Sequence, residues 1–473
     1  MKILLIFSQN RSRKNLQLSE DDISIPLGIG YLASVLEREK HDVHVFDFQL
    51  RNATEEQLIS KIESEDFDLF GISAATPAAY HAYDTARLLK ERCPDVPVVL
   101  GGPHVSAVKE NIFKECRHVD ILVFGEGDDT IVDIVKAISV KSDLRTIAGI
   151  SYIDKGMPVT TSRRAYVKDL DNIPFPAYHL FDVDRYKNNP FPGQFFRLPM
   201  LNIITSRGCP FKCIFCDRGS MGEAFRSRSA ANIVAEIGFL VERYGVKEIR
   251  FHDDNFMVDR KRVHEFCELL LKKKLDIVWR CSARVDLVDK ETLSLMRRAG
   301  FVSISFGIES GSEKILKSIK KGITKEQVRN ALRSCKELGI ETKAFFMMNL
   351  PGETIEDVEE TLKFGRELPL DWASYQIAFP IPGTELRETV RKNNYTIDYS
   401  KWDNWGIQMS NEVYYEQDGL PAEYLRKAMK RAWRGFYLRP RIIFNFLKRI
   451  RDLQTLKSYL RGLAILLRLR AIG

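Results

Sequence analysis

Residues 206–216 read Ser-Arg-Gly-Cys-Pro-Phe-Lys-Cys-Ile-Phe-Cys and place three thiols, Cys209, Cys213 and Cys216, within eight positions. A loop this short can bring three sulfurs onto one centre, and thiolates favour zinc or iron–sulfur clusters. Structural zinc normally takes four protein ligands, yet no further Cys or His follows within the next thirty residues. The nearest later candidates are His252, Cys267 and Cys281. Three ligands where four are expected leave one metal position open to a substrate or cofactor.

The spacing CxxxCxΦC, with the aromatic Φ supplied by Phe215, resembles the cluster loop of the radical S-adenosylmethionine (SAM) enzymes. In that family three cysteines hold a [4Fe–4S] cluster, and SAM chelates the fourth iron through its amino and carboxylate groups. The resemblance implies that Cys209, Cys213 and Cys216 bind the cluster and that the backbone at Phe215 contacts SAM. It also implies a one-electron donor of the flavodoxin or ferredoxin type.

Length and composition are those of a globular protein with two to four domains: 473 residues, 44% hydrophobic and 29% charged. Eight cysteines, three of them in one loop, predict reduced thiols and a cytoplasmic location. The apolar run Met1–Phe7 is too short for a signal peptide. No stretch approaches the roughly 20 apolar residues that span a bilayer. We therefore expect a protein that is not integral to a membrane.

Residues 1–140 alternate between short apolar runs and helix-length segments. The runs are Ile3–Phe7, Val43–Phe46, Leu69–Ser73, Val96–Leu100 and Ile121–Phe124. The segments between and after them lie near Leu27–Glu39, Thr54–Glu65, Ala78–Arg92, Val105–Cys116 and Thr130–Ser139. This alternation predicts an α/β domain with a doubly wound, Rossmann-like parallel sheet. Ligands of such sheets bind beyond the carboxyl ends of the strands, where this chain has small residues at 73–77, 101–104 and 125–128.

The first domain carries further motifs. Ser73 and Gly101-Gly102 resemble the SxL…GG part of cobalamin-binding domains, and Pro-Leu-Gly-Ile-Gly-Tyr-Leu-Ala at 26–33 is a landmark of the cobalamin-dependent radical SAM group. In the DxHxxG motif of many such domains a His binds cobalt, but Leu27 stands at that place here. The resemblance implies cobalamin contacts from Ser73, Ala74, Thr76, Gly101, Gly102, Pro103, His104, Gly125, Glu126 and Gly127. Two alternatives remain: the domain binds no ligand, or His104 only caps the next helix.

Residues 141–199 change character. Gly149–Thr161 predicts a small hairpin around the Lys155-Gly156 turn. Residues 173–193 are dense in Pro and aromatic side chains, which favours a connector that wraps between two domains over a free linker. A similar connector occurs in the radical SAM group.

Residues 200–400 return to the alternation of strands and helices. Six strands are expected at Leu201–Thr205, Glu248–His252, Ile277–Ser282, Val302–Phe306, Thr342–Met347 and Trp372–Ala378. They suit a partial, open (β/α)6 TIM-like barrel, and six is also the number that the radical SAM family uses. The active site of such a barrel gathers at the carboxyl ends of its strands.

SAM offers an ammonium, a carboxylate, a sulfonium and a ribose diol, so its site needs carboxylates, a cation and backbone groups together. The resemblance assigns Glu309 and Ser310 to the ribose and methionyl parts and Asp254 to the ammonium. Further SAM contacts are implied for Arg284, Leu350, Pro351 and Gly352, the last three under the adenine. Asn349 stands where many relatives have Gly. Each position also has a plainer explanation as a helix cap, a surface pair or a turn.

Together these features resemble a cobalamin-dependent radical SAM methyltransferase. The implied reaction methylates an unactivated carbon of a small-molecule or lipid-like substrate after a 5′-deoxyadenosyl radical abstracts hydrogen. One alternative is a cobalamin-dependent radical SAM enzyme that closes or rearranges rings without moving a methyl group. An alternative from another class is a non-catalytic corrinoid- or zinc-binding protein.

Residues 401–473 form a basic tail that we expect to be mainly helical. From Pro421 onward there are fourteen Lys or Arg and two acidic residues. Between Arg439 and Ile472 apolar residues recur at three- and four-residue steps, which predicts an amphipathic helix. The helix either packs on the barrel or lies on an anionic membrane surface, making the protein peripheral there. Nucleic acid is disfavoured because the basic residues alternate with aliphatic ones.

Overall fold

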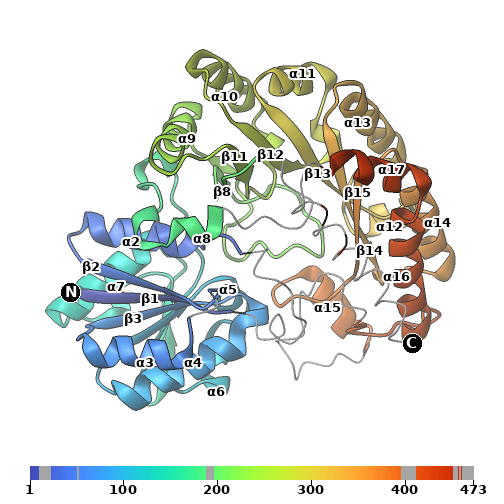
Figure 1. Ribbon diagram of the computed structural model, residues 1–473. Coiled ribbons are helices and arrows are strands. Elements are labelled where there is room, and N and C mark those ends of the chain that lie inside the picture. The colour runs from blue at the N-terminus through green and yellow to red at the C-terminus, as the bar shows by residue number, and fades with distance from the viewer. Residues whose placement is uncertain are drawn as a thin grey trace.

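The computed structural model describes residues 1–9, 23–50, 53–187, 197–395 and 412–450, together with Leu456 and Leu460. Figure 1 shows two α/β bodies side by side, an N-terminal domain in blue and cyan and a second sheet with its helices in green to orange. The α/β class and the two-body organisation agree with the sequence prediction.

The N-terminal sheet has seven strands in the order β2-β1-β3-β4-β5-β6-β7. The first five in this order are parallel: β2 (Asp42–Asp47), β1 (Lys2–Phe7), β3 (Leu69–Ser73), β4 (Val98–Gly101) and β5 (Ile121–Val123). The predicted hairpin, β6 (Ile150–Asp154) and β7 (Met157–Thr160), joins this sheet by antiparallel pairing with β5. The sheet thus extends beyond the domain boundary that the sequence suggested at residue 140.

Both faces of this sheet are covered by helices. On β1, Ile3 and Leu5 belong to the apolar core that also contains residues of α2 (Leu27–Arg38) and α7 (Asp128–Val140). The alternate residues Leu4 and Ile6 pack with α3 (Glu55–Ser64) and α4 (Ala79–Arg92). This alternation explains the continuous apolar runs, because strands of a doubly covered parallel sheet are buried on both sides.

One predicted helix of this domain is interrupted. Instead of a single helix near Val105–Cys116, the chain forms α5 (Pro103–Val108) and α6 (Ile112–Glu115). Lys109 lies between them with a φ of 59°, a left-handed conformation that ends a right-handed helix.

The connector contacts both domains in its described part, which includes α8 (Val183–Lys187). The amide of Ala177 donates to the carbonyl of Gly30 in α2 at 3.0 Å. The hydroxyl of buried Tyr178 donates to the Glu236 carboxylate at 2.8 Å, within α9 (Ala230–Tyr244) of the second domain. Residues 188–196 lie outside the described part.

The second sheet is the predicted six-stranded parallel sheet, in the order β15-β14-β13-β12-β11-β8. Its strands are β8 (Met200–Ile203), β11 (Glu248–Phe251), β12 (Val278–Ala283), β13 (Phe301–Glu309), β14 (Glu341–Met348) and β15 (Trp372–Ile377). The helices besides α9 are α10 (Arg260–Lys273), α11 (Lys290–Arg298), α12 (Glu313–Ser318), α13 (Lys325–Glu337), α14 (Ile355–Glu367) and α15 (Glu385–Lys392). Since β8 and β15 are the two edges, the sheet is an open, partial barrel.

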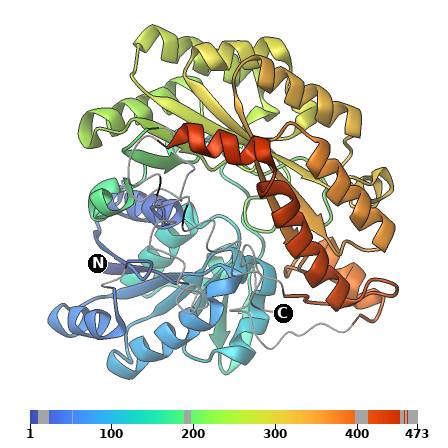
Figure 2. The ribbon, with the colours of Figure 1, turned by 45° about the vertical axis from the view of Figure 1, so that its right-hand side comes forward.

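The C-terminal helices α16 (Ala422–Tyr437) and α17 (Pro440–Arg449) run along the β15 side of the barrel (Figure 2). From α17, Ile442 is fully buried, and the Phe446 ring lies 4.8 Å from the ring of Trp372. The predicted amphipathic helix is therefore packed on the barrel over α17. Most of the remaining predicted stretch, at 451–455, 457–459 and 461–473, lies outside the described residues. Among the described helices, none has the length and apolar character to cross a membrane.

Candidate active site

The three-cysteine loop covers residues 208–225 and is closed at its base by a short antiparallel ribbon. The ribbon pairs β9 (Ser206–Arg207) with β10 (Arg226–Ser227), and Arg207 lies opposite Arg226. Gly208 opens the loop with a φ of 80°, and a side chain at that position would collide with the carbonyl oxygen of Ala224. Glycine is required there because it alone adopts this conformation without a steric cost.

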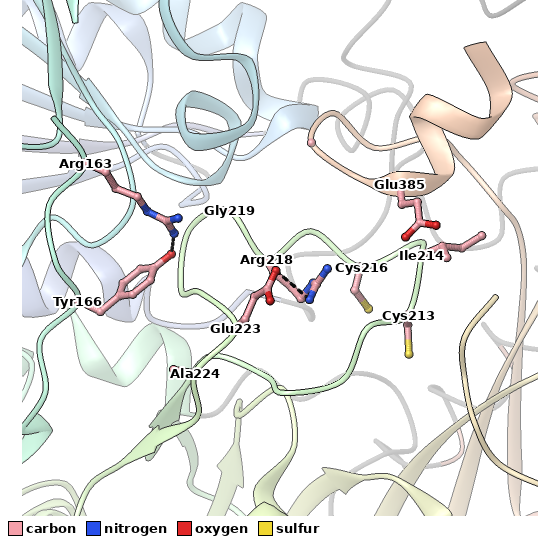
Figure 3. A pocket seen from close by; sticks show the side chains of 11 residues that line it. Arg163, Tyr166, Cys213, Ile214, Cys216, Arg218, Gly219, Glu223, Ala224 and Glu385 are labelled. Atoms are coloured by element: carbon pink, nitrogen blue, oxygen red, sulfur yellow. Dashed lines mark hydrogen bonds and ion pairs between the residues drawn. The ribbon is translucent and has the colours of Figure 1, made fainter. Parts of the chain in front are cut away.

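The three predicted cluster ligands are free thiols: Cys213 is buried, Cys209 half-buried and Cys216 exposed. In the view of Figure 3 the side chains of Cys213 and Cys216 both point downward from the loop. Within the described residues, no three metal-binding side chains are already assembled around one point, so a cluster would have to draw the thiols together. Three thiols on one loop remain a donor set suited to an iron–sulfur cluster.

Arg284, predicted from the resemblance, follows β12 and lies over the loop. Its guanidinium carbon is 3.8 Å from the centre of the Phe211 ring, and Nη1 lies 3.9 Å from the sulfur of Cys213. Two hydrogen bonds of 2.9 Å from Nε and Nη2 to Asp286 hold the guanidinium in this orientation. A fixed cation at this position would offset part of the negative charge that three thiolate ligands bring to a metal centre.

Glu309 ends β13 with a φ of 70° and is buried. Its Oε1 accepts a hydrogen bond of 2.8 Å from Nζ of Lys321, which is also buried. Although burial lowers the pKa of Lys321, the Glu309 carboxylate raises it above the usual value overall. Sequence reasoning missed Lys321, because this residue lies in the loop after α12 and not at the end of a strand. The neighbouring Ser310 turns its hydroxyl to Thr361 of α14, 3.0 Å away.

Asp253 and Asp254 have opposite roles. Asp253 is buried and accepts hydrogen bonds from the Thr205 amide at 2.7 Å and the Ser206 hydroxyl at 2.6 Å, which anchors the start of the ribbon. Asp254 and His252 reach solvent at the carboxyl end of β11. The surrounding protein nevertheless raises the pKa of Asp254 through burial and Asp253, and burial lowers the pKa of His252 to about 3. Both side chains are thus accessible at the carboxyl end of β11.

The predicted adenine segment, Leu350 to Gly352, is covered by residues 412–420. Gln417 donates to Oδ1 of Asn349 at 3.0 Å and accepts from the Gly352 amide at 3.0 Å. Asn349 has a φ of 69°, a region in which Asn is tolerated better than most residues other than Gly. This conformation explains why Asn can stand where many relatives have Gly. The sequence did not identify Tyr415 and Gln417 as residues that cover this segment, since no motif marks them.

The predicted cobalamin residues gather at one edge of the N-terminal sheet. Ser73 and Gly101 are register partners at the carboxyl ends of β3 and β4. Gly102 has a φ of 104°, and a Cβ there would be 2.7 Å from the carbonyl oxygen of Ala74. Partly exposed Gly101, Gly102 and Gly125 leave this edge with little side-chain cover, which fits a wide, flat ligand. Of the other predicted residues, Ala74 and Thr76 are buried beside this edge, Pro103 begins α5 and Gly127 precedes α7.

His104 is completely buried beneath this edge. Its Nε2 lies 2.9 Å from the Tyr83 hydroxyl, and its Nδ1 lies 3.3 Å from the Thr76 hydroxyl. Burial, with a smaller contribution from Arg387, lowers the pKa of His104 to about 4, so the imidazole is neutral near pH 7. Both ring nitrogens of His104 have protein partners, so the side chain stabilises the turn around it. The imidazole does not cap α5, and neither ring nitrogen is free to bind a ligand in this conformation.

Glu126 was predicted to contact cobalamin, but its carboxylate has other partners. It accepts hydrogen bonds from Arg207 at 3.2 Å and from Arg226 at 2.8 Å, both at the base of the cysteine loop. The amide of Val167 in the connector donates to its second oxygen at 2.9 Å. The side chain of Glu126 therefore joins the two domains instead of facing the open edge.

A cavity of about 460 Å³ lies beside the cysteine loop (Figure 3). It is lined by Cys213 and Cys216, by Arg163 and Tyr166 from the segment after β7, and by charged side chains that include Arg218 and Glu385. This space could admit a polar small molecule next to the thiols.

Comparisons with known proteins agree with this geometry. Residues 203–365 match the Radical SAM superfamily, and residues 21–135 match the B12 binding domain. The chain is 35% identical over 446 residues to an uncharacterized methyltransferase of Pyrococcus horikoshii, with 94% of each chain covered. It is 32% identical over 385 residues to an anaerobic magnesium-protoporphyrin IX monomethyl ester cyclase of Rubrivivax gelatinosus, covering 80% of this chain and 68% of the relative.

Among solved structures, the cobalamin-dependent S-adenosylmethionine radical enzyme OxsB, with aqua-cobalamin and SAM bound, is similar with a TM-score of 0.73. The sequence identity is 20%, and the similarity covers 97% of this chain and 70% of that chain. The two proteins share a fold.

Proposed function

The chain belongs to the radical SAM superfamily and carries a B12 binding domain, and from this premise we propose that it methylates an unactivated carbon of a small-molecule substrate. It is a cobalamin-dependent radical SAM enzyme whose cofactors are a [4Fe–4S] cluster, SAM and cobalamin. When bound, the cluster supplies the electron that cleaves SAM to a 5′-deoxyadenosyl radical, and cobalamin supplies the methyl group.

The protein's own residues would bind and orient these groups. Cys209, Cys213 and Cys216 would hold the cluster, with the Arg284 guanidinium beside Cys213 offsetting part of the negative charge of the thiolates. Glu309 is the carboxylate proposed for the ribose and methionyl parts of SAM. An electron donor of the flavodoxin or ferredoxin type would approach the exposed side of the loop.

The observation that best supports methyl transfer is the contact between the cysteine loop and the predicted cobalamin edge. A Cβ on Gly219 of the loop would lie 3.6 Å from the carbonyl oxygen of Ser106, and one on Gly125 would lie 3.7 Å from the carbonyl oxygen of Ser220. Ser106 also fixes this edge, since its hydroxyl accepts a hydrogen bond of 3.0 Å from the Gly125 amide. This contact supports a close approach of the two proposed cofactor sites, as transfer between them requires.

The proposal is tested with anaerobically reconstituted protein and SAM that carries a trideuterated methyl group. A fractionated extract of small molecules and lipids serves as the source of substrate. We expect S-adenosylhomocysteine and 5′-deoxyadenosine in equal amounts, and an extract component that gains the labelled methyl group. Formation of 5′-deoxyadenosine without S-adenosylhomocysteine would exclude methyl transfer.

Ring closure without methyl transfer is the second candidate, and the similarity to a cyclase of Rubrivivax gelatinosus supports it. The relative that aligns over 94% of both chains is named a methyltransferase, which favours the first candidate. Counting S-adenosylhomocysteine and 5′-deoxyadenosine separates the two candidates, because ring closure converts SAM to 5′-deoxyadenosine and forms no S-adenosylhomocysteine.

We also propose that the C-terminal region contacts an anionic membrane surface, which would suit a lipid-like substrate. On α17, Ile443, Phe444 and Leu447 are 43%, 56% and 59% exposed, beside the buried Ile442 that packs on the barrel. From Pro421 to its end the chain carries fourteen basic residues against two acidic ones. Each basic residue near an anionic surface contributes about 1 kcal/mol.

Co-sedimentation with phosphatidylserine-containing vesicles tests this surface in the full chain. Replacing both Phe444 and Leu447 with Ser should reduce pelleting at low salt, and high salt should reduce it for the unaltered protein. The control is Val140→Ser, which removes an equally exposed apolar side chain from the N-terminal domain. Equal pelleting of all three proteins, or of none, refutes the membrane contact.

A further inference from the structure

Four buried charges lie between the two domains and form what we call the interdomain ion cluster: Arg207, Arg226, Glu126 and Asp128. Their side chains are 7%, 10%, 4% and 5% exposed, respectively. The two cations come from the barrel and the two anions from the segment that follows β5 in the N-terminal domain. The interdomain ion cluster contains two cations and two anions, so none of its members is an uncompensated buried ion.

The geometry of the ion cluster is that of paired, charge-assisted hydrogen bonds. Arg207 binds Asp128 with two parallel bonds, of 2.6 Å from Nη1 and 3.1 Å from Nη2. Nη1 of Arg226 lies 2.8 Å from both oxygens of Glu126. Such bidentate pairs fix the relative orientation of their partners as well as their distance.

The position of the two arginines makes the ion cluster relevant to the cysteine loop. Arg207 and Arg226 are the register partners in the ribbon that closes the loop, and Arg207 lies two residues before Cys209. The loop is thus held at its base to the N-terminal domain. At its tip, Ser220 lies against Gly125, one residue before Glu126.

The two anions, Glu126 and Asp128, lie next to the predicted cobalamin edge. Glu126 follows the predicted cobalamin edge directly, and Asp128 is the first residue of α7, where a negative charge is also favoured by the helix dipole. Residues 125–128 therefore border the predicted cobalamin edge. The same short segment holds the loop that carries Cys209, Cys213 and Cys216.

From this arrangement we propose that the interdomain ion cluster sets the placement of the iron–sulfur loop relative to cobalamin, with Arg207 as the central positioning residue. This inference rests on the proposed function. Buried ion pairs contribute little net stability but constrain geometry, whereas a displacement of 1 Å between reacting groups can lower a rate by about 100-fold. Loss of the ion cluster should therefore impair methyl transfer more than the reductive cleavage of SAM.

The test compares Arg207→Gln with Arg280→Gln in the full-length, reconstituted protein. Arg280 forms a matched buried pair with Glu248 at 2.6 Å, but both residues belong to neighbouring barrel strands, so its loss leaves the domain contact intact. Under the proposed function, and with a chemical reductant but no substrate, S-adenosylhomocysteine would report transfer of the SAM methyl group to reduced cobalamin, and 5′-deoxyadenosine would report reductive cleavage. We expect the ratio of the first product to the second to fall about tenfold in Arg207→Gln and to stay unchanged in Arg280→Gln.

A second measurement does not depend on activity. Hydrogen exchange of the cofactor-free protein should become faster in residues 208–225 and 125–128 of Arg207→Gln, but not in those of Arg280→Gln. Arg207→Lys keeps the charge and loses the bidentate geometry, and it should give intermediate exchange. Equal exchange and equal product ratios in the Arg207 and Arg280 variants would overturn the inference. If the unaltered protein forms no S-adenosylhomocysteine, the proposed methyl transfer fails, while hydrogen exchange still decides the role of the ion cluster.

Discussion

Cys213 is the thiol of the cysteine loop with the most defined surroundings, since it is buried and lies 3.9 Å from both Arg284 and the Lys320 carbonyl. We predict that Cys213→Ala loses most of the reconstituted iron and all reductive SAM cleavage, because it removes one of the three thiols of the loop. Iron content and 5′-deoxyadenosine formation measure this effect. The control is Cys267→Ala, a buried thiol of α10, which should keep both. Full SAM cleavage by the Cys213 variant would contradict the ligand assignment.

Glu353 gives the protein a predictable pH dependence. Burial raises the pKa of this carboxyl from 4.5 to about 8 in the folded state, although its Oε2 accepts a hydrogen bond of 3.0 Å from the Leu350 amide. The folded state therefore binds more protons than the unfolded state between pH 4.5 and 8. The stability conferred by the neutral carboxyl is complete below pH 4.5 and is lost as the pH rises to 8.

Across this window the free energy of unfolding should fall by up to about 1.4 kcal/mol per pH unit. In Glu353→Gln the corresponding slope should be smaller, as measured by thermal unfolding of the cofactor-free protein between pH 4 and 9. Glu356→Gln is the control, because Glu356 is exposed in the first turn of α14, just after Glu353, and its pKa is lowered, not raised. A slope that Glu353→Gln leaves unchanged would show that this carboxyl does not titrate in the window.

Single residues can be predicted where a motif carries their chemistry, but not where only folding brings distant residues together. The sequence pointed to Arg284, and the structure places it against Phe211 and Cys213. Lys321 was missed, since only the folded chain brings it to Glu309. Glu126 was expected to face cobalamin, but its partners Arg207 and Arg226 lie far away in the sequence and could not be inferred from it.

At the scale of elements, Gly102 shows how a turn constrains its residues. The resemblance implies a cobalamin contact at Gly102, and the structure shows that a side chain there would already meet the backbone of Ala74, at 2.7 Å. Gly102→Val should therefore destabilise the N-terminal domain by about 1–3 kcal/mol and abolish cobalamin binding, with iron binding by the barrel preserved. Cobalamin titration by absorbance and iron analysis measure the two effects.

Gly101→Ala is the matched variant at the neighbouring position. A Cβ at Gly101 meets the Val123 side chain at 3.7 Å, an ordinary van der Waals contact, so this variant should keep the thermal stability of the domain. Cobalamin binding by Gly102→Val with unaltered affinity would contradict the proposed edge.

Helices and strands were predictable because the apolar pattern reflects burial. The five parallel strands of the first sheet and the six of the barrel lie where short apolar runs predicted them. The pattern could not show the break at Lys109, which depends on a single backbone conformation. It also could not show that the hairpin β6–β7 continues the first sheet, because strand pairing is a tertiary property.

At the scale of the whole molecule, the sequence supplied the two cofactor domains but not their mutual placement. The contacts that determine this placement are the interdomain ion cluster and the connector, in which Ala177 bonds to α2 and the adjacent Tyr178 bonds to α9. They involve ordinary charged and aromatic residues without a distinctive spacing. The structure thus contributes what the motifs do not show, a direct contact between the cysteine loop and the N-terminal domain.

The central claim is methyl transfer that uses both cofactors in one molecule. Its most direct test is the count of S-adenosylhomocysteine and 5′-deoxyadenosine from trideuteromethyl-labelled SAM, incubated anaerobically with the reconstituted full-length protein and a small-molecule extract. The account predicts equal amounts of the two products and a labelled methyl group on one extract component, all lost in Cys213→Ala. Formation of 5′-deoxyadenosine with no S-adenosylhomocysteine and no labelled product would contradict it.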